Sequence, residues 1–524
     1  MRHDLRLHAE QHAPAQRLPY GIAEDLDALL LPSAQDPLEK TLVEIGLTDP
    51  ACAARRLHEW RADAPLALQS VTEQDALNGV LPMLLEQLAR FEDPDATLAA
   101  LDEILGRLPD HISLFAPFRA EPGLMRSVLN LLGHAPNLSR YLVAQPHLIR
   151  RLIDATAYAP LPSTATLDAE FGMLMRSVDR NTGARRFAEA VGAYRFGIGV
   201  QLLEARTDAL DAAAAQCDLA EAALRAAADD AITRIADAHG VVPGAELVIV
   251  ALGGFGGRAL THASDLDLVY LFTGDSRAQS DGRKPLDANE YFSRIAQQIT
   301  AAMSTVTTLG PLYEIDTRLR PWGAKGLLAC STETFERYHA DNAWTWEHMA
   351  LTRARPIYGS EAARATVRAI VSHRLRTTRN RDALLADAIK MRGDIARHKP
   401  AKGLFDVKLI EGGMIDLEFV VQVRQLDCHV GIDPRLGHSL RSLVAAGLVA
   451  PELIEAHAML GRLLTTLRLL SPGGHEPAPE RRATIATACG CRDWAALLGS
   501  YARARAVVRA TWEGITREGG TDRD

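Results

Sequence analysis

The spacing of apolar and polar residues predicts a largely helical chain. Apolar side chains recur at intervals of three and four residues through most of the sequence, as on one face of an α-helix. The stretches with this pattern are about 41–155, about 167–240 and about 333 to the end, the last with one interruption near 405–413. In the first stretch, Pro94, Pro122, Pro136 and Pro146 each stand where proline favours the first turn of a helix.

A different pattern lies between the second and third helical stretches. Residues 246–252 (ELVIVAL) form a continuous apolar run, typical of a buried strand, and a glycine turn follows them. Residues 264–272 (SDLDLVYLF) predict a second strand, and 288–303 predict a helix. Residues 312–320 (LYEIDTRLR) predict a third strand, which Pro321 ends. The predicted fold class is therefore mainly α, with a small mixed sheet inserted.

Composition shifts divide the chain into candidate domains. A Pro- and Ser/Thr-containing stretch at 156–165 indicates a linker. The expected parts are a lead-in at 1–40, a helical region at 41–155, an α/β domain with its preceding long helices at 166–375, and a helical domain at 376–524.

Charge and composition narrow the classes of function. The 524 residues include 58 Lys and Arg against 66 Asp and Glu, a formal net charge of −8. A net acidic chain does not favour sequence-independent binding to a nucleic-acid backbone. The six cysteines form no C-x-x-C pair, no apolar run is long enough for a membrane span, and the start of the chain lacks a signal-peptide pattern. We expect a cytoplasmic protein without nucleic-acid or membrane partners.

The candidate chemistry lies in the mixed segment. Asp265 and Asp267 are two residues apart on a predicted strand, so both carboxylates leave the same face. Asp316 on the third predicted strand offers another carboxylate if the two faces meet. Converging carboxylates repel one another unless a cation lies between them, and this arrangement can hold two Mg²⁺ ions against a nucleoside triphosphate.

Backbone and cationic groups complete a possible nucleotide site. Gly253, Gly254, Gly256 and Gly257 form a turn whose N–H groups could approach phosphate oxygens, and Ser264 adds a hydroxyl. The cations predicted to bind phosphates are Arg318, Arg320 and Lys325. The turn also fits G-x-G-x-x-A, but the next strand follows too soon for the helix of a dinucleotide-binding fold, and no P-loop motif is present.

These segments together resemble a known family. The glycine turn followed by Ser264-Asp-Leu-Asp-Leu268 is similar to the signature of polymerase-β-type nucleotidyltransferases. Residues 312–326 (LYEIDTRLRPWGAKG), 343–355 (AWTWEHMALTRAR) and 405–419 (FDVKLIEGGMIDLEF) resemble glutamine synthetase adenylyltransferases, also called glutamate–ammonia-ligase adenylyltransferases. The resemblance runs from about 41 to 518. It departs from the commoner pattern at Gly254, where a basic residue is frequent, and at Ala259, where a glutamate is frequent.

The resemblance implies a polymerase-β-type domain flanked by helical domains and a Mg²⁺-dependent enzyme. Such an enzyme transfers AMP from ATP to a tyrosine of glutamine synthetase, under control of glutamine and a PII-type signal protein. Because family members usually carry two catalytic units and this sequence has one Ser-Asp-x-Asp motif, it resembles the adenylylating half with the central helical region. Removal of AMP is therefore not expected.

Several alternatives stay open. Asp406, Lys408, Asp416 and Glu418 could contact the nucleotide or metals, or form a salt-bridged seam between domains. Trp344 and Trp346 are predicted to be core residues and not adenine stackers. The acceptor could be another protein or a small molecule. The chain could also be a catalytically silent nucleotide-binding module, although such a module would have no physical need to keep three mutually repelling acids.

Overall fold

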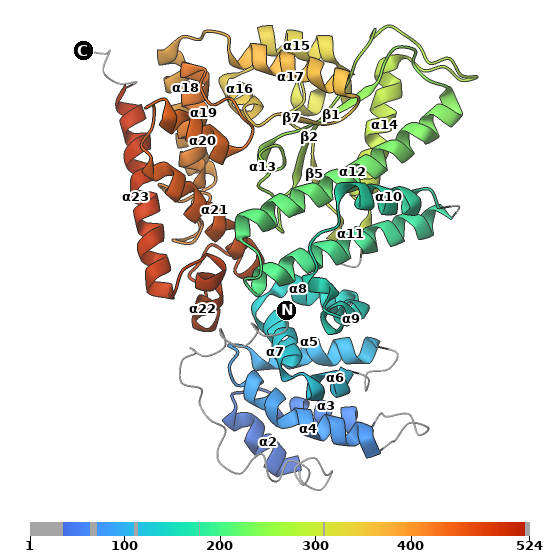
Figure 1. The fold of residues 1–524 in the computed structure, drawn as a ribbon, viewed down its shortest axis with the longest axis vertical. Coiled ribbons are helices and arrows are strands. Elements are labelled where there is room, and N and C mark those ends of the chain that lie inside the picture. Colours follow the sequence, from blue (N-terminus) through green and yellow to red (C-terminus); the bar gives the residue numbers. More distant parts are fainter. Residues whose placement is uncertain (1–34, 63–70, 109–113, 178, 308–309, 519–524) are drawn as a thin grey trace. The chain divides into compact units, whose positions relative to one another are not determined.

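The computed structural model describes residues 35–62, 71–108, 114–177, 179–307 and 310–518 of the 524-residue chain. These residues form two compact units (Figure 1). The first contains the described residues up to Thr156 together with Ala478–Arg481, and the second contains Ala157–Pro477 and Arg482 onward. None of the described helices combines the length and the apolar character that a membrane crossing requires.

The first unit is helical. Its elements are α2 (Gln35–Glu44), α3 (Pro50–Ala62), α4 (Val71–Leu88), α5 (Pro94–Arg107), α6 (Phe115–Ala120), α7 (Pro122–His134), α8 (Pro136–Ala144), η3 (Pro146–Leu148) and α9 (Ile149–Ile153). The predicted helix starts at prolines are confirmed, because α5, α7, α8 and η3 each begin at one. At α5, the Asp93 carboxylate also accepts a hydrogen bond of 2.8 Å from the N–H of Ala96, as a helix cap does.

The second unit begins with three helices, α10 (Thr164–Met175), α11 (Arg180–Leu203) and α12 (Ala209–His239), after a short turn η4 (Thr156–Tyr158). α12 packs against α10, α11 and α14 (Ala288–Met303). Its buried face is rich in alanine, which lets the neighbouring helices approach closely. The predicted helix at 288–303 is confirmed at both ends by α14.

A five-stranded mixed sheet forms the centre of this unit. Its strands are β1 (Leu247–Ala251), β2 (Leu266–Phe272), β5 (Ile315–Asp316), β6 (Ala329–Ser331) and β7 (Arg355–Tyr358). The order is β5-β2-β1-β7, with β6 also paired to β2. β1 is antiparallel to both its neighbours, whereas β2 is parallel to β5 and β6. Every residue of β1 is buried, as its apolar run predicted.

Two features of the sheet differ from the prediction. The third strand comprises only two residues, and the chain turns away after Asp316 instead of continuing to Arg320. β7 lies in a stretch that was predicted to be helical, and it pairs with β1. Each is too short to leave a periodic pattern in the sequence. A separate two-stranded ladder joins β3 (Val306–Thr307) and β4 (Gly310–Pro311).

Beyond β6, the regular elements of the described chain are helices, apart from β7. They are α15 (Thr332–Asp341), α16 (Thr345–Leu351), α17 (Glu361–Leu375), α18 (Arg381–His398), α19 (Met414–Cys428), α20 (Leu436–Ala445), α21 (Glu452–Leu470), α22 (Pro479–Ala488) and α23 (Trp494–Glu518), with a short turn η5 (Gly323–Lys325) before β6. The predicted interruption near 405–413 is confirmed as the irregular segment between α18 and α19.

Candidate active site

Three carboxylates meet at one end of the sheet. Asp267 on β2 and Asp316 on β5 are register partners in a parallel pair of strands, so the two side chains lie beside each other. Asp265 precedes β2 by one residue. One oxygen from each of the three carboxylates lies within 4.8 Å of the others. The convergence predicted from the spacing of the acids is therefore present in the fold.

The surroundings of Asp267 and Asp316 shift the pKa values of these two acids in opposite directions. Burial raises the pKa of Asp267 to about 6, with repulsion from Asp265 and Asp316 adding to the shift. Hydrogen bonds from Arg318 lower the pKa of Asp316. The Arg318 guanidinium lies across the Asp316 carboxylate, with Nε at 2.9 Å from Oδ2. A carboxylate with a raised pKa, held beside two others, is the electrostatic signature of a site that favours a cation.

The glycine turn packs directly on this cluster. It forms α13 (Gly253–Gly256), and the N–H of Leu252 donates to the carbonyl of Asp267 at 3.0 Å. Gly253 has a φ of +53°, and a Cβ atom there would lie 2.0 Å from Oδ2 of Asp267. A Cβ atom on Gly256 would lie 2.0 Å from the carbonyl oxygen of Arg353. Only glycine fits these two positions, so the turn and the acid cluster form one tightly packed structure.

Two arginines fix the other side of the turn. Arg355 on β7 donates to the carbonyls of Gly256 at 3.0 Å and Phe255 at 2.9 Å. The same guanidinium pairs with Glu221 on α12 at 2.7 Å. Arg258 pairs with Asp218 on α12 through bonds of 2.7 and 2.9 Å. The turn is thus anchored to the long helix, a role for Arg355 and Arg258 that the sequence pattern did not indicate.

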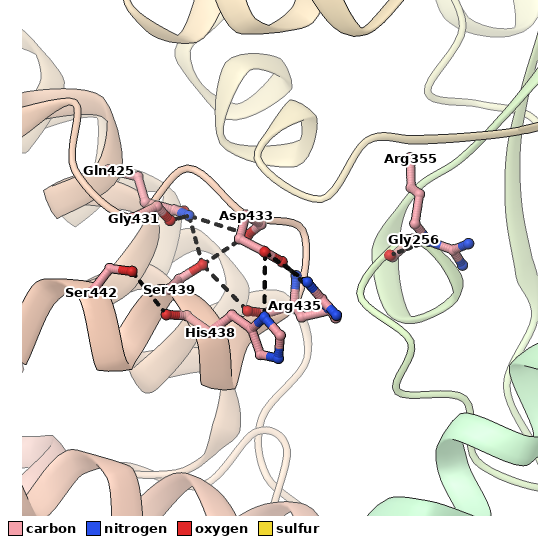
Figure 2. Close-up of polar contacts among 9 residues, drawn as sticks. All are labelled: Gly256, Arg355, Gln425, Gly431, Asp433, Arg435, His438, Ser439 and Ser442. Atoms are coloured by element: carbon pink, nitrogen blue, oxygen red, sulfur yellow. Dashed lines mark hydrogen bonds and ion pairs between the residues drawn. The ribbon is translucent and has the colours of Figure 1, made fainter. Parts of the chain in front are cut away.

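A loop between α19 and α20 also contacts the turn. A Cβ atom on Gly257 would lie 3.3 Å from the carbonyl oxygen of Pro434. Figure 2 shows the polar groups on either side, with Arg355 at Gly256 and the pair formed by Asp433 and Arg435 on the loop. Helix α19 holds the loop in place, because the side chain of Gln425 donates to the carbonyl of Gly431 at 2.7 Å. The helical C-terminal part of this unit therefore supports the glycine turn.

The other predicted nucleotide ligands lie in different settings. The Ser264 hydroxyl accepts from the N–H of Thr261 at 3.0 Å and so closes the turn before β2. The side chain of Arg320 donates to the Thr317 carbonyl at 2.9 Å and to the Gly326 carbonyl at 3.3 Å, within its own loop. Lys325, in η5, lines a pocket next to Arg318. Arg318, the remaining cation predicted to bind phosphate, directly contacts Asp316 of the acid cluster.

The pocket has a volume of about 850 Å³ and lies beside the segment that follows β5. Its lining includes three tryptophans, which are 53%, 71% and 41% exposed: Trp322, Trp344 and Trp346. The prediction that Trp344 and Trp346 belong to the core is wrong. The helical spacing of residues 343–355 gave no sign of this exposure, because α16 presents its other face, with Met349 and Leu351, to the core.

The candidate residues of the segment 405–419 have different contacts. The Lys408 ammonium is close enough to Asp267 to lower the pKa of that carboxyl, against the larger effect of burial. Asp416 is buried, pairs with Arg392 and accepts from the N–H of Gly412 at 2.6 Å. Glu418 pairs with Arg353 at 3.1 Å, behind the glycine turn. Asp406 caps its own loop, accepting from the N–H of Lys402 at 3.2 Å. Among these residues, Lys408 acts electrostatically on Asp267 of the acid cluster.

Comparison with protein families agrees with this geometry. Residues 125–370, which contain the acid cluster, the glycine turn and the tryptophan pocket, match the family model "Glutamate-ammonia ligase adenylyltransferase". Residues 388–516, which contain Lys408 and α19–α21, match the model "GlnD PII-uridylyltransferase".

Several curated proteins with similar sequences carry the name bifunctional glutamine synthetase adenylyltransferase/adenylyl-removing enzyme. The protein from Xanthobacter autotrophicus is 34% identical over 94% of this chain and 51% of its own length. Those from Rhizobium meliloti and Mesorhizobium japonicum are 33% and 35% identical, over 92% and 83% of this chain and 50% and 45% of their own lengths. The chain spans about half the length of the curated relatives it matches. The resemblance noted in the sequence is thereby confirmed: residues 125–370 match the glutamate–ammonia ligase adenylyltransferase family model.

Proposed function

We propose that this chain transfers AMP from ATP to a tyrosine hydroxyl of glutamine synthetase and releases pyrophosphate. The observation that carries the proposal is the cluster of Asp265, Asp267 and Asp316 against a glycine turn, inside the segment that matches the adenylyltransferase family. We further propose that the mixed sheet is a polymerase-β-type nucleotidyltransferase domain. The order of strand, glycine turn and acid-bearing strand supports this assignment.

The donor set suits magnesium. Three carboxylates within 4.8 Å of one another offer the all-oxygen environment that Mg²⁺ prefers. The raised pKa of Asp267 reflects charge repulsion and burial that a bound cation would offset. Asp265, Asp267 and Asp316 would hold two Mg²⁺ ions. When bound, these would neutralise phosphate charge and lower the pKa of the attacking phenol.

The residues of the chain would act by positioning. The N–H groups of Gly256 and Gly257 donate to the carbonyls of Leu252 and Gly253, so the sequence prediction that they reach phosphates does not hold. The N–H groups at the start of the turn, from Gly253 and Gly254, would take the phosphates that leave as pyrophosphate, and Arg318 would neutralise charge near the α-phosphate. The tyrosine oxygen attacks that phosphorus in line, and its bond to phosphorus forms as the bond from the α-phosphorus to the bridging oxygen breaks. The phenol proton passes to water, and the bridging oxygen leaves with pyrophosphate. Most of the acceleration would come from alignment and charge neutralisation.

Control by other nitrogen signals is part of the proposal. The match of residues 388–516 to a PII-uridylyltransferase model supports regulation through a PII-type protein. Lys408 links that segment to the acid cluster, so a change in the segment could alter the site. Glutamine is proposed as the second effector from the family resemblance.

The test is incubation of the chain with glutamine synthetase, Mg²⁺ and α-labelled ATP. We expect label on a synthetase tyrosine, and a loss of at least 1,000-fold in Asp265→Asn, because one of the three carboxylates that would hold the charge-neutralising Mg²⁺ is gone. Asp237→Asn, an exposed aspartate on α12, serves as the matched control and should keep full activity.

Other results would point elsewhere. An active Asp265→Asn protein would contradict the assignment of the acid cluster. Tight binding of Mg·ATP without label on the synthetase would indicate a nucleotidyltransferase with a different acceptor. Absence of both AMP transfer and Mg·ATP binding in the wild-type chain would favour a catalytically silent module that does not use the nucleotide.

A further inference from the structure

One side of the pocket is formed by Trp322, Trp344 and Trp346, and is called the tryptophan wall below. Contacts between these residues and their neighbours hold it rigidly. Glu347 is 5% exposed, and its carboxylate accepts from the hydroxyl of Tyr338 at 2.7 Å and from the N–H of Trp344 at 2.8 Å. The ring of Tyr338 meets the ring of Trp322 edge to face, with centroids 4.9 Å apart. One buried carboxylate thus ties Trp344 to Tyr338, against which Trp322 packs.

The backbone at this wall is strained. Trp322 has a φ of +59°, a left-handed conformation that bulky residues rarely adopt. The adjacent Gly323 also has a positive φ, of +57°. Strained conformations persist where the surrounding structure enforces them, often at sites of binding. Here the strain presents a large aromatic ring, 53% exposed, at the edge of a pocket.

An exposed aromatic surface of this size is typical of a binding site. Trp322, Trp344 and Trp346 are joined at the pocket by Leu327, which is 56% exposed. Exposed apolar patches commonly mark binding sites, and tryptophan is enriched among residues that dominate protein–protein affinity. This surface is larger than one purine ring covers, because each tryptophan can bury about 150–250 Å².

The position of the pocket indicates that it binds the acceptor and not the nucleotide. In the order β5-β2-β1-β7, the glycine turn follows β1, and the pocket residues 318–327 follow β5. The acid cluster on β2 and β5 therefore lies between the turn and the pocket. In an in-line transfer the attacking oxygen and the leaving oxygen stand on opposite sides of the phosphorus. If pyrophosphate leaves over the turn, the acceptor arrives from the side of the pocket.

We propose that the wall of Trp322, Trp344 and Trp346 is the docking site for the tyrosine-bearing loop of the acceptor protein. This inference rests on the proposed function, under which the acceptor is glutamine synthetase. Apolar side chains of the loop pack on the tryptophans, and the tyrosine ring extends past Arg318 toward Asp316. Lys325 then faces the acceptor, where it complements an acidic group, and not the nucleotide.

The test compares two affinities in the same variants. Binding of glutamine synthetase to the full chain is measured by biolayer interferometry without nucleotide, and binding of Mg·ATP is measured by equilibrium dialysis without synthetase. In Trp344→Ala and Trp346→Ala we expect the dissociation constant for the synthetase to rise at least tenfold, while that for Mg·ATP changes less than twofold. Leu327→Ser, in the lining of the same pocket, should act in the same direction. Met173→Ala on α10, 66% exposed and absent from the pocket lining, is the control and should leave both affinities unchanged.

Each other result has a definite meaning. Unchanged synthetase binding in the tryptophan variants would overturn the inference. So would a tenfold loss of Mg·ATP affinity with synthetase binding retained, because the pocket would then hold the adenine base. Failure of the wild-type chain to bind the synthetase would also overturn it. Tryptophan-dependent binding without AMP transfer would uphold the docking site and refute the proposed reaction.

Discussion

At the scale of single residues, the acid cluster and the glycine turn were predictable and their surroundings were not. The spacing of Asp265 and Asp267 predicts a common face from sequence alone, and the three acids do converge, with one oxygen of each within 4.8 Å of the others. Asp316 joins them as the register partner of Asp267. Arg355, which holds two carbonyls of the turn, comes from a strand too short to recognise. The exposure of Trp344 depends on which face of α16 meets the core, and that is decided by tertiary packing.

The pKa of Asp267 makes the stability of the metal-free protein depend on pH. The carboxyl binds its proton more tightly in the folded state, with a pKa of about 6 against 3.8 when unfolded, so its contribution to stability falls as pH rises through this range. We expect Asp267→Asn to raise the midpoint of thermal unfolding at pH 7.5 by about 2 °C without Mg²⁺. Calorimetry of both proteins without Mg²⁺ measures this difference in midpoint. A second pair of scans in roughly 10 mM Mg²⁺ measures how far the bound cation raises each midpoint. A wild-type midpoint that Mg²⁺ leaves unchanged would contradict it.

The same pKa predicts the pH dependence of metal binding. Below about pH 6 a proton competes with the cation at Asp267, so affinity should fall by up to about tenfold per unit of pH. Titration with Mn²⁺ followed by electron paramagnetic resonance between pH 5 and pH 8 measures this slope. A flat profile across that range would show that Asp267 is not a ligand.

Gly253 and Gly254 form a matched pair for testing the turn. A Cβ atom at Gly253 would meet Oδ2 of Asp267 at 2.0 Å and force a left-handed alanine, a strain of about 1–2 kcal/mol. At Gly254 the nearest atom would be the Ala259 carbonyl oxygen at 3.3 Å. We expect Gly253→Ala to lower AMP transfer at least 100-fold and Gly254→Ala to lower it less than fivefold, as order-of-magnitude estimates from the loss of alignment. Equal effects would show that contact with Asp267 is unimportant.

At the scale of elements, long periodic segments were predictable and short ones were not. α14 has a well-defined apolar face and a cap at Asp287, whose side chain accepts from the N–H of Glu290, so its ends follow from local chemistry. β5 stops after two residues because the chain turns at Thr317, where the Arg320 side chain bonds the Thr317 carbonyl. The sequence 312–320 alternates like a strand, but these loop contacts override that pattern.

The start of α19 depends on a buried ion pair. Asp416 lies in the first turn of the helix and pairs with Arg392 of α18. Removing one partner leaves the other charge buried, which typically costs about 3–5 kcal/mol. We expect Asp416→Ala to destabilise the second unit by about 3 kcal/mol, measured by urea unfolding. Asp394→Ala breaks the exposed pair with Arg397 on the same helix α18 and should cost less than about 1 kcal/mol.

At the scale of the whole molecule, the described residues contain one cluster of acids suited to a metal. The relatives named as bifunctional adenylyltransferase/adenylyl-removing enzymes are about twice as long as the matched segment. Under the proposed function, one such centre among the described residues leads us to expect that the chain adds AMP and does not remove it with phosphate.

This expectation can be measured directly. Adenylylated glutamine synthetase, incubated with the chain and inorganic phosphate, should lose less than about 5% of its label in the time that full adenylylation takes, roughly a twentyfold difference in rate. Addition of pyrophosphate, the product of the forward reaction, is the control and should release label by reversal. Rapid release with phosphate alone would show that the same acids serve both reactions.

The exposed tryptophan wall also makes the intrinsic fluorescence of the protein sensitive to binding at the pocket. The chain has six tryptophans, and three of them lie at the pocket. The other three are sheltered: Trp60 is buried, Trp494 stacks on Phe405, and Trp512 packs edge-on against Phe419. Water around the pocket tryptophans should shift their emission to longer wavelength, so the fluorescence of the unlabelled chain should move toward the blue whenever that surface is covered.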